Sequence, residues 1–294
     1  MNIQNMADSQ INAPLLELES MIGFGGQVPS GLKVHPDKQH LIYPVGCTVV
    51  IEDIGSKKQE FLSGHTNSIS CIAVSKSGRY VASGQVTHSG FKADIIIWDF
   101  QTRSMYCKLT LHHNNVEALS FSPNDQYLVS LGGQDDGSVV VWSIARKDAI
   151  CGSPAQVMSA GLTHTVCYSN TSENIFVTGG SGTLRVWELD VEHRKIRPTE
   201  VQMGQLKRVI RCIEMAEDDS FFYCGTSTGD IVAVNMTSKF FQAQGPKELF
   251  SQGVTALTLL ANGELLVGTG DGTVAVVKDK DSTPQTTTPL AHPE

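Results

Sequence analysis

A repeat of about 45 residues constrains the fold of this chain more than any other feature. Three β-rich runs end on a tryptophan and then a polar residue: ADIIIWD (93–99), GSVVVWS (137–143) and GTLRVWE (182–188). The three tryptophans, Trp98, Trp142 and Trp187, are 44 and 45 residues apart. Such a period is typical of repeat architectures in which each unit is one supersecondary element that packs against its neighbours.

The repeat extends in both directions as weaker copies. Ile51 lies 47 residues before the first tryptophan, Val234 lies 47 residues after the last, and Val277 follows 43 residues later. Two other short β-branched runs precede most of these positions, and turn signals such as KSG at 76–78 and PND at 123–125 separate them. The sequence therefore predicts an all-β chain of six four-stranded units, arranged as the blades of a propeller.

The chain resembles the WD-repeat propeller family. The stretch SGHTNSIS (63–70) supplies the Gly-His pair of that family, and IIIWD supplies its Trp-Asp pair. The resemblance predicts a WD40 β-propeller over residues 21–278, an N-terminal extension over 1–20 and a disordered Thr/Pro-rich tail over 279–294. Seven blades are the commonest number in this family, so six units predict a truncated or incomplete seven-blade ring. Closure with six blades is the alternative.

The family resemblance also implies a buried polar set within each blade. His65 is expected to be the buried histidine of the Gly-His pair, and Trp98 and Trp187 are expected to be structural. The unit that ends at Trp142 has most of the set, with the histidine at 112 or 113. Its expected members are His112 or His113, Ser130, Asp136 and Trp142. At the Asp136 position the other units have Val45, Lys92, Ser181, Thr228 and Asp271, so most blades are expected to depend on apolar packing.

Composition and motifs exclude several functional classes. A formal charge of −8 disfavours nucleic-acid and anionic-membrane binding, which depend on basic residues. The sequence contains no phosphate-binding GxxxxGK[ST] and no HExxH, so no enzyme activity, cofactor or small-molecule substrate is expected. Seven cysteines without a CxxC pair predict no metal site and a reducing, cytoplasmic compartment.

One turn is about twice as long as its equivalents elsewhere in the repeat. The insertion QVTHSGFKAD (85–94) joins the runs YVASG and IIIWD, whereas GGSG (179–182) suffices in another unit. An aromatic residue on a loop held by a rigid scaffold is a common binding feature. The residues expected to contact a partner are Gln85, His88, Phe91 and Lys92. The alternative is that Phe91 packs over the rim of its own blade.

Basic residues gather in one segment of this acidic chain. Six of the 22 lysines and arginines lie within 194–211, and Lys207 and Arg208 are expected to contact an acidic partner. The alternative is a solvated loop between two blades.

The insertion also carries a narrower resemblance. ASGQV, then a Gly-containing loop, then IIIWD resembles the echinoderm-microtubule-associated-protein-like branch of WD proteins, whose tandem propellers associate with microtubules. Stretches such as MIGFGGQVPSGLKVHPD and RVWELDVEHRKIRPTE resemble the N-terminal half of members that lie inside axonemal doublet microtubules. The resemblance implies a non-enzymatic structural protein of the cytoskeleton in motile cilia and flagella, which supports doublet stability and motility.

That resemblance implies tubulin and other microtubule inner proteins of the axoneme as partners. A net-negative chain is compatible with the microtubule lumen, where the acidic tubulin tails do not project. The alternative function is a soluble cytoplasmic WD-repeat scaffold for multiprotein complexes.

Overall fold

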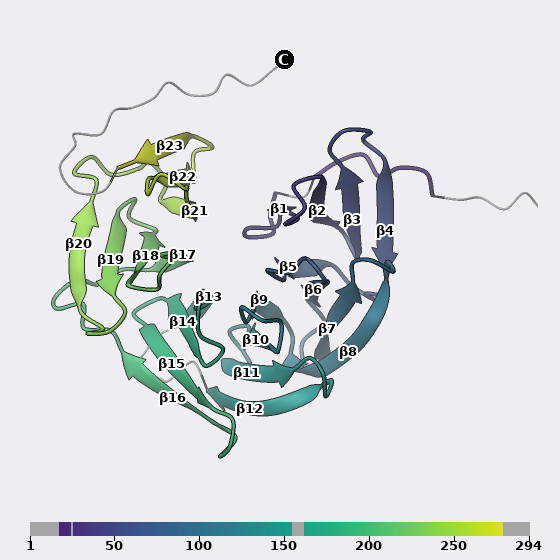
Figure 1. The fold of residues 1–294 in the computed structure, drawn as a ribbon, viewed down its shortest axis with the longest axis horizontal. Coiled ribbons are helices and arrows are strands. Elements are labelled where there is room, and N and C mark those ends of the chain that lie inside the picture. Colours follow the sequence, from purple (N-terminus) through teal and green to yellow (C-terminus); the bar gives the residue numbers. More distant parts are fainter. Residues whose placement is uncertain (1–17, 25, 155–161, 279–294) are drawn as a thin grey trace, which may run out of the picture.

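The computed structural model describes residues 18–24, 26–154 and 162–278, and its regular structure consists of strands (Figure 1). Blade 1 comprises β1 (Lys33–Val34), β2 (His40–Val45), β3 (Thr48–Asp53) and β4 (Gln59–Ser63). Blade 2 comprises β5 (Ile69–Val74), β6 (Tyr80–Gln85), β7 (Lys92–Asp99) and β8 (Ser104–His113). Blade 3 comprises β9 (Val116–Phe121), β10 (Tyr127–Gly132), β11 (Ser138–Ser143) and β12 (Asp148–Pro154).

The second half of the chain repeats this pattern. Blade 4 comprises β13 (Thr163–Tyr168), β14 (Ile175–Gly180), β15 (Leu184–Asp190) and β16 (Lys195–Glu200). Blade 5 comprises β17 (Ile210–Met215), β18 (Phe221–Thr226), β19 (Ile231–Asn235) and β20 (Phe241–Gly245). Blade 6 comprises β21 (Val254–Leu259), β22 (Leu265–Thr269) and β23 (Val274–Val277). The prediction of six units is confirmed, although the last sheet has three strands, not four, within the described residues.

The blades succeed one another around a common axis. In each sheet consecutive strands pair antiparallel, the first strand lies near the axis and the last lies at the rim (Figure 1). In Figure 1 the ring is open between blade 6 and blade 1, and no described strand lies in that interval. An open ring agrees with the expectation of an incomplete propeller.

The hydrophobic core lies between the blades. β-branched and aromatic residues alternate along the strands, so each sheet presents one apolar face to each neighbour. Ile95 and Ile97 of blade 2, for example, belong to one cluster with Val116 and Leu119 of blade 3. Among the described residues there are five such clusters, one for each pair of successive blades from 1–2 to 5–6.

A second set of contacts joins blades 1 to 5 at one face of the ring. The turn between the first and second strands of each blade binds the equivalent turn of the next blade. These inter-turn contacts are His35 Nε2 with Gly78 O (2.8 Å), Ser77 with Asp125, Asn124 N with Glu173 Oε1 (2.6 Å) and Asn170 N with Asp219 Oδ1 (2.8 Å). Polar contacts between turns thus add to the apolar clusters that connect successive sheets.

The residues outside the propeller strands are only partly described. Met21 N donates a hydrogen bond to Gln59 Oε1 (2.8 Å), so the segment before β1 packs against β4. Most of the expected extension (1–20) and the whole of the expected tail (279–294) lie outside the described residues. Within the described residues, no helix has the length and apolarity to span a bilayer.

Candidate partner-binding surface

Blade 3 contains a buried chain of polar side chains that begins at its tryptophan. Trp142 Nε1 donates to Ser130 Oγ (2.7 Å), and the same hydroxyl lies 2.6 Å from His112 Nε2. His112 Nδ1 in turn contacts the carboxylate of Asp136. His113 is exposed and lies opposite Lys92 in the β7–β8 ladder, so the histidine of this set is His112. The chain ties strands β8, β10 and β11 to the turn that precedes β11.

Blade 2 contains an equivalent series of hydrogen-bonded side chains, of which only the tryptophan and the histidine were predicted from the sequence. Trp98 Nε1 donates to Ser83 Oγ (2.8 Å), His65 Nε2 lies 2.7 Å from that hydroxyl, and His65 Nδ1 lies 2.9 Å from Gln85 Oε1. Gln85 is only 2% exposed. Its side chain therefore supports His65, and the prediction that Gln85 contacts a partner is wrong for this structure. Burial lowers the pKa of His65, although the Gln85 bond opposes that shift.

Polar contacts also occur in blades 4 to 6. Trp187 Nε1 donates to Thr178 Oγ1 (2.8 Å) in blade 4. In blade 5 the buried carboxylate of Asp230 accepts from Thr228 Oγ1 (2.7 Å), and in blade 6 Asp271 accepts from Thr273 Oγ1 (2.8 Å). Most blades therefore have polar contacts in addition to the apolar packing on which they were expected to depend. Asp230 was missed because the repeat placed Thr228 at the aspartate position.

The basic residues of segment 194–211 do not form one patch. Arg197 lies on the outer strand β16 and pairs with Asp190 (2.8 Å), whereas Arg211 lies on the innermost strand β17. Arg208 binds the buried Asp230 (Nε to Oδ2 2.9 Å), so its charge is already compensated. Of the two basic residues expected to contact a partner, Lys207 is exposed and Arg208 serves mainly to hold blade 5.

The insertion is an ordered loop held by the segment that follows β8. Thr87 N donates to Asn114 O (2.6 Å), and Asn114 N donates to Phe91 O (3.0 Å). The Asn114 side chain accepts from Gly90 N (2.8 Å) and donates to Asp135 Oδ2 (2.7 Å). One asparagine thereby connects the insertion of blade 2 to the QDDG turn of blade 3.

The insertion presents an aromatic side chain to solvent. Phe91 is 66% exposed, so it does not pack over the rim of its own blade. His88 and Lys92 are exposed beside it in the sequence. We call the exposed side chains of His88, Phe91 and Lys92 the insertion surface. Because the backbone beneath it is fixed by hydrogen bonds, this surface can meet a partner with little loss of conformational entropy.

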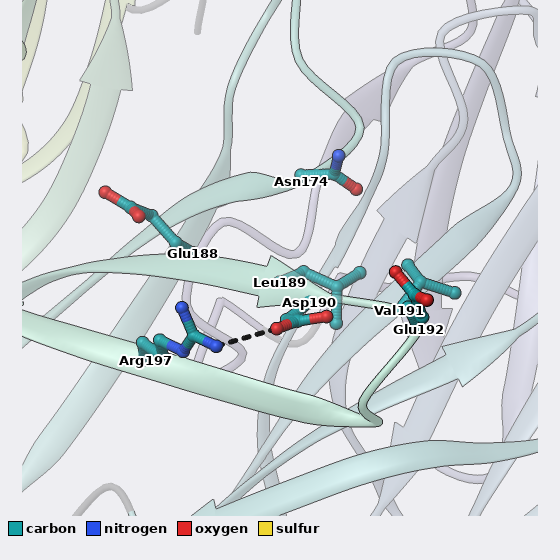
Figure 2. Close-up of a pocket in the computed structure, with 7 residues that line it drawn as sticks. All are labelled: Asn174, Glu188, Leu189, Asp190, Val191, Glu192 and Arg197. Atoms are coloured by element: carbon teal, nitrogen blue, oxygen red, sulfur yellow. Dashed lines mark hydrogen bonds and ion pairs between the residues drawn. The ribbon is translucent and has the colours of Figure 1, made fainter.

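A separate open hollow of about 350 Å³ lies at the outer part of blade 4 (Figure 2). Its lining is Asn174, Glu188, Leu189, Asp190, Val191, Glu192 and Arg197. Its charged groups are largely paired, since Asp190 binds Arg197 and Glu188 lies 3.1 Å from Lys239. The lining contains no hydroxyl, thiol or imidazole, and its acidic side chains are those of Glu188, Asp190 and Glu192.

Comparison with known proteins gives concordant matches. A family model described as the echinoderm microtubule-associated protein first beta-propeller matches residues 58–293. The cilia- and flagella-associated protein 52 of Bos taurus is 56% identical over 278 residues, which is 94% of this chain and 45% of that protein. The protein of the same name from Chlamydomonas reinhardtii is 43% identical over 90% of this chain and 43% of its own length.

The chain thus spans about half the length of these relatives. Among solved structures, the crystal structure of the RRP9 WD40 repeats matches with a TM-score of 0.68 at 21% identity, over 86% of this chain and 77% of that one. At that identity the likeness concerns the fold alone.

Proposed function

This chain belongs to the echinoderm microtubule-associated protein first β-propeller family, and on that premise we propose that it is a non-enzymatic structural protein of axonemal doublet microtubules in motile cilia and flagella. The observation that carries the proposal is the 56% identity over 94% of the chain to a protein named as associated with cilia and flagella. Identity of that degree across all six blades supports a common role for the whole propeller surface.

The proposed location is the lumen of the doublet, with tubulin and neighbouring inner proteins as partners. The charge of −8 is compatible with an inner position, because the acidic tubulin tails that would repel an acidic chain project from the outer surface. In the lumen, binding would depend on shape and on local loop contacts. The propeller supports this role because its rigid blades hold many loops in fixed positions.

The proposed contact is the insertion surface, with Lys207 as a second, separate contact. Phe91 supplies apolar area that is solvated in the free chain, and His88 and Lys92 supply polar groups around it. Interfaces commonly concentrate their binding free energy in an aromatic residue surrounded by polar side chains. We therefore expect docking to depend on Phe91 more than on any charged residue.

The location is tested by detergent and high-salt extraction of motile axonemes that contain the tagged chain. Retention of the chain with the doublets supports the proposal. Complete release into the soluble fraction contradicts it for this chain and favours a soluble cytoplasmic scaffold. An extended chain that includes the remaining length of the relatives, run in parallel, shows whether a further segment supplies the anchor.

The contact is tested by the substitution Phe91→Ser. Loss of a central aromatic contact should weaken binding to doublets by about 2 kcal/mol, which is roughly 30-fold. Phe240→Ser is the matched control, because Phe240 is similarly exposed (54%) but lies before β20 on blade 5. Equal binding by Phe91→Ser and Phe240→Ser would show that the insertion is not the docking element.

A further inference from the structure

The hairpin that joins β1 to β2 brings together two histidines and an aspartate. His35, Asp37 and His40 each offer one ligand atom, and these atoms lie within 4.8 Å of one another. His35 Nδ1 lies 2.9 Å from Asp37 Oδ2, and His40 Nδ1 lies 2.7 Å from the same oxygen. No metal site was expected from the sequence, because it contains neither a CxxC pair nor HExxH.

The hydrogen bonds of His35 leave its Nδ1 facing an acceptor. His35 Nε2 lies 2.8 Å from Gly78 O, and a carbonyl oxygen only accepts, so the proton of a neutral ring is on Nε2. Nδ1 then carries a lone pair, which a long bond from Asp37 N (3.2 Å) satisfies in part. The same lone pair lies 2.9 Å from a carboxylate oxygen, and two acceptors at that distance repel each other unless a proton or a metal ion lies between them.

The three side chains are held in place by other contacts. The His35 ring stacks on Phe100 with centroids 3.7 Å apart, and its bond to Gly78 O is the kind of outer contact that orients metal-binding histidines. Asp37 Oδ1 accepts hydrogen bonds from Gln39 N (2.8 Å) and His40 N (3.2 Å), so Oδ2 is the oxygen that can bind a metal ion. The side chains of His35, Asp37 and His40 are 7%, 30% and 21% exposed, so the cluster opens to water on one side.

We propose that His35, Asp37 and His40 form a binding site for a divalent transition metal ion, with Zn²⁺ as the ion that fits best. Two imidazole nitrogens and one carboxylate oxygen suit Zn²⁺, and water completes the tetrahedron. At metal–ligand distances of about 2.0–2.2 Å, nitrogen and oxygen ligands lie about 3.4 Å apart, so the cluster widens slightly on binding.

The bound ion would fasten blade 1. This blade flanks the opening of the ring (Figure 1), and its only apolar cluster with another blade is the one it shares with blade 2 among the described residues. The metal would link His40, at the start of β2, to His35, which is itself bonded to Gly78 of blade 2. Metal binding would thereby stabilise the hairpin and the contact between blades 1 and 2.

The test uses the whole chain with Cys47→Ser, because Cys47 is an exposed thiol that could bind zinc. Zinc titration by calorimetry should give one site. His40→Ala and Asp37→Asn should each weaken that affinity by about 100-fold or more, since loss of outer contacts alone costs about 10–100-fold. His193→Ala is the matched control. His193 follows Asp190 at the same sequence spacing as His40 follows Asp37, and its Nδ1 lies 3.0 Å from Asp190 Oδ1, but no second histidine of the described residues joins that pair.

Two spectroscopic readouts keep the result interpretable. Circular dichroism shows whether each variant is folded. If His40→Ala is unfolded, Asp37→Asn provides the test of zinc affinity. Bound Co²⁺ should show visible bands of a nitrogen and oxygen site without the sulfur-to-metal absorption of a thiolate. The proposal is overturned if the parent binds no zinc at micromolar concentrations, if His40→Ala and Asp37→Asn bind as tightly as the parent, or if the Co²⁺ spectrum shows thiolate ligation.

Discussion

Single hydroxyl groups hold the buried polar chains of the blades together. In blade 3, Ser130 accepts from Trp142 and contacts His112, so its removal leaves two buried groups without a partner. We expect Ser130→Ala to lower the free energy of unfolding by about 1–3 kcal/mol, because each unpaired buried polar group is costly. Chemical denaturation measures the loss. Ser89→Ala, at an exposed position in the insertion, should be neutral, and equal effects would contradict this account.

The contribution of His65 to stability should depend on pH. Burial lowers the pKa of His65 below that of an unfolded histidine, so the unfolded state gains a proton first as the pH falls through about 6.5. The contribution of His65 to stability is therefore present above that pH and is lost below it. In blade 3 a carboxylate, Asp136, takes the place of Gln85 beside the histidine Nδ1.

The substitution Gln85→Glu tests this pH dependence. A carboxylate beside Nδ1 favours the charged ring, so the pKa of His65 should rise. An NMR titration of the His65 ring protons measures the change directly, and the loss of stability between pH 7 and 5.5 should become smaller. An unchanged titration would mean that desolvation alone controls His65.

Some of these residues could be predicted from the sequence and others could not. Trp98, Trp142 and Trp187 were visible because their residue type recurs at a fixed period. The role of Gln85 could not be predicted. Its amide oxygen can accept a hydrogen bond from an imidazole as a carboxylate does, but the sequence does not show whether the side chain points to the histidine or to solvent. The metal cluster was hidden for a related reason, since a tight turn between β1 and β2 determines its geometry.

At the level of strands, small residues allow the blades to approach closely. A Cβ added to Gly84 of β6 would lie 2.6 Å from Val116 Cβ of the next blade and 2.8 Å from Cys71 Sγ. Gly84→Ala should therefore destabilise the chain by about 1–3 kcal/mol through overpacking. Gly268→Ala in β22 is the matched control, because its nearest neighbour would be Ala256 Cβ at an ordinary 3.4 Å. Thermal unfolding of both variants compares them, and similar midpoints would contradict the packing argument.

The insertion depends on an element that is not adjacent to it in the sequence. Asn114 binds the backbone of Gly90 and the side chain of Asp135, and β8 extends ten residues to bring it there. Asn114→Ala should release residues 86–91 with less than about 1 kcal/mol of lost global stability, because the loop is at the surface. Hydrogen exchange of that segment should become faster while β10 is unaffected. Unchanged exchange would show that the backbone contacts alone hold the loop.

The sequence revealed the length of the insertion but not its support. A loop length can be read from the interval between two strand patterns. The β-ladder pairing of Lys92 with His113 cannot be read from the sequence, because the last residues of β8 show no alternation of apolar and polar residues that would distinguish a strand from a turn. Phe91, His88 and Lys92 were expected in the loop and lie at the surface. Gln85 was expected to contact a partner from the same loop, but it lies at the end of β6 and is buried.

Across the whole molecule, the number of blades was predictable from the period, whereas the open ring was expected only from the resemblance to a family in which seven blades are commonest. The period counts units because every unit must bury a face against its neighbour. Closure depends on whether the first and last blades meet, and no local pattern encodes that contact. The described residues form five inter-blade clusters for six blades, which is the number expected of an open ring.

An open ring should unfold from its ends. Blades 1 and 6 each share an apolar cluster with one neighbour, whereas blades 2 to 5 share clusters with two. The inter-turn contacts connect blades 1 to 5, so blade 1 again contacts one neighbour while blades 2 to 4 contact two, and in repeat arrays stability is nearly the sum of such neighbour terms. Hydrogen exchange measured by mass spectrometry should therefore show β3 and β22 exchanging before β10 and β14. Uniform exchange across all six blades would instead indicate one cooperative unit, which requires that the end blades be stabilised by contact with each other or with a second molecule. Dilution separates those two cases, because only a contact between molecules weakens as the protein concentration falls.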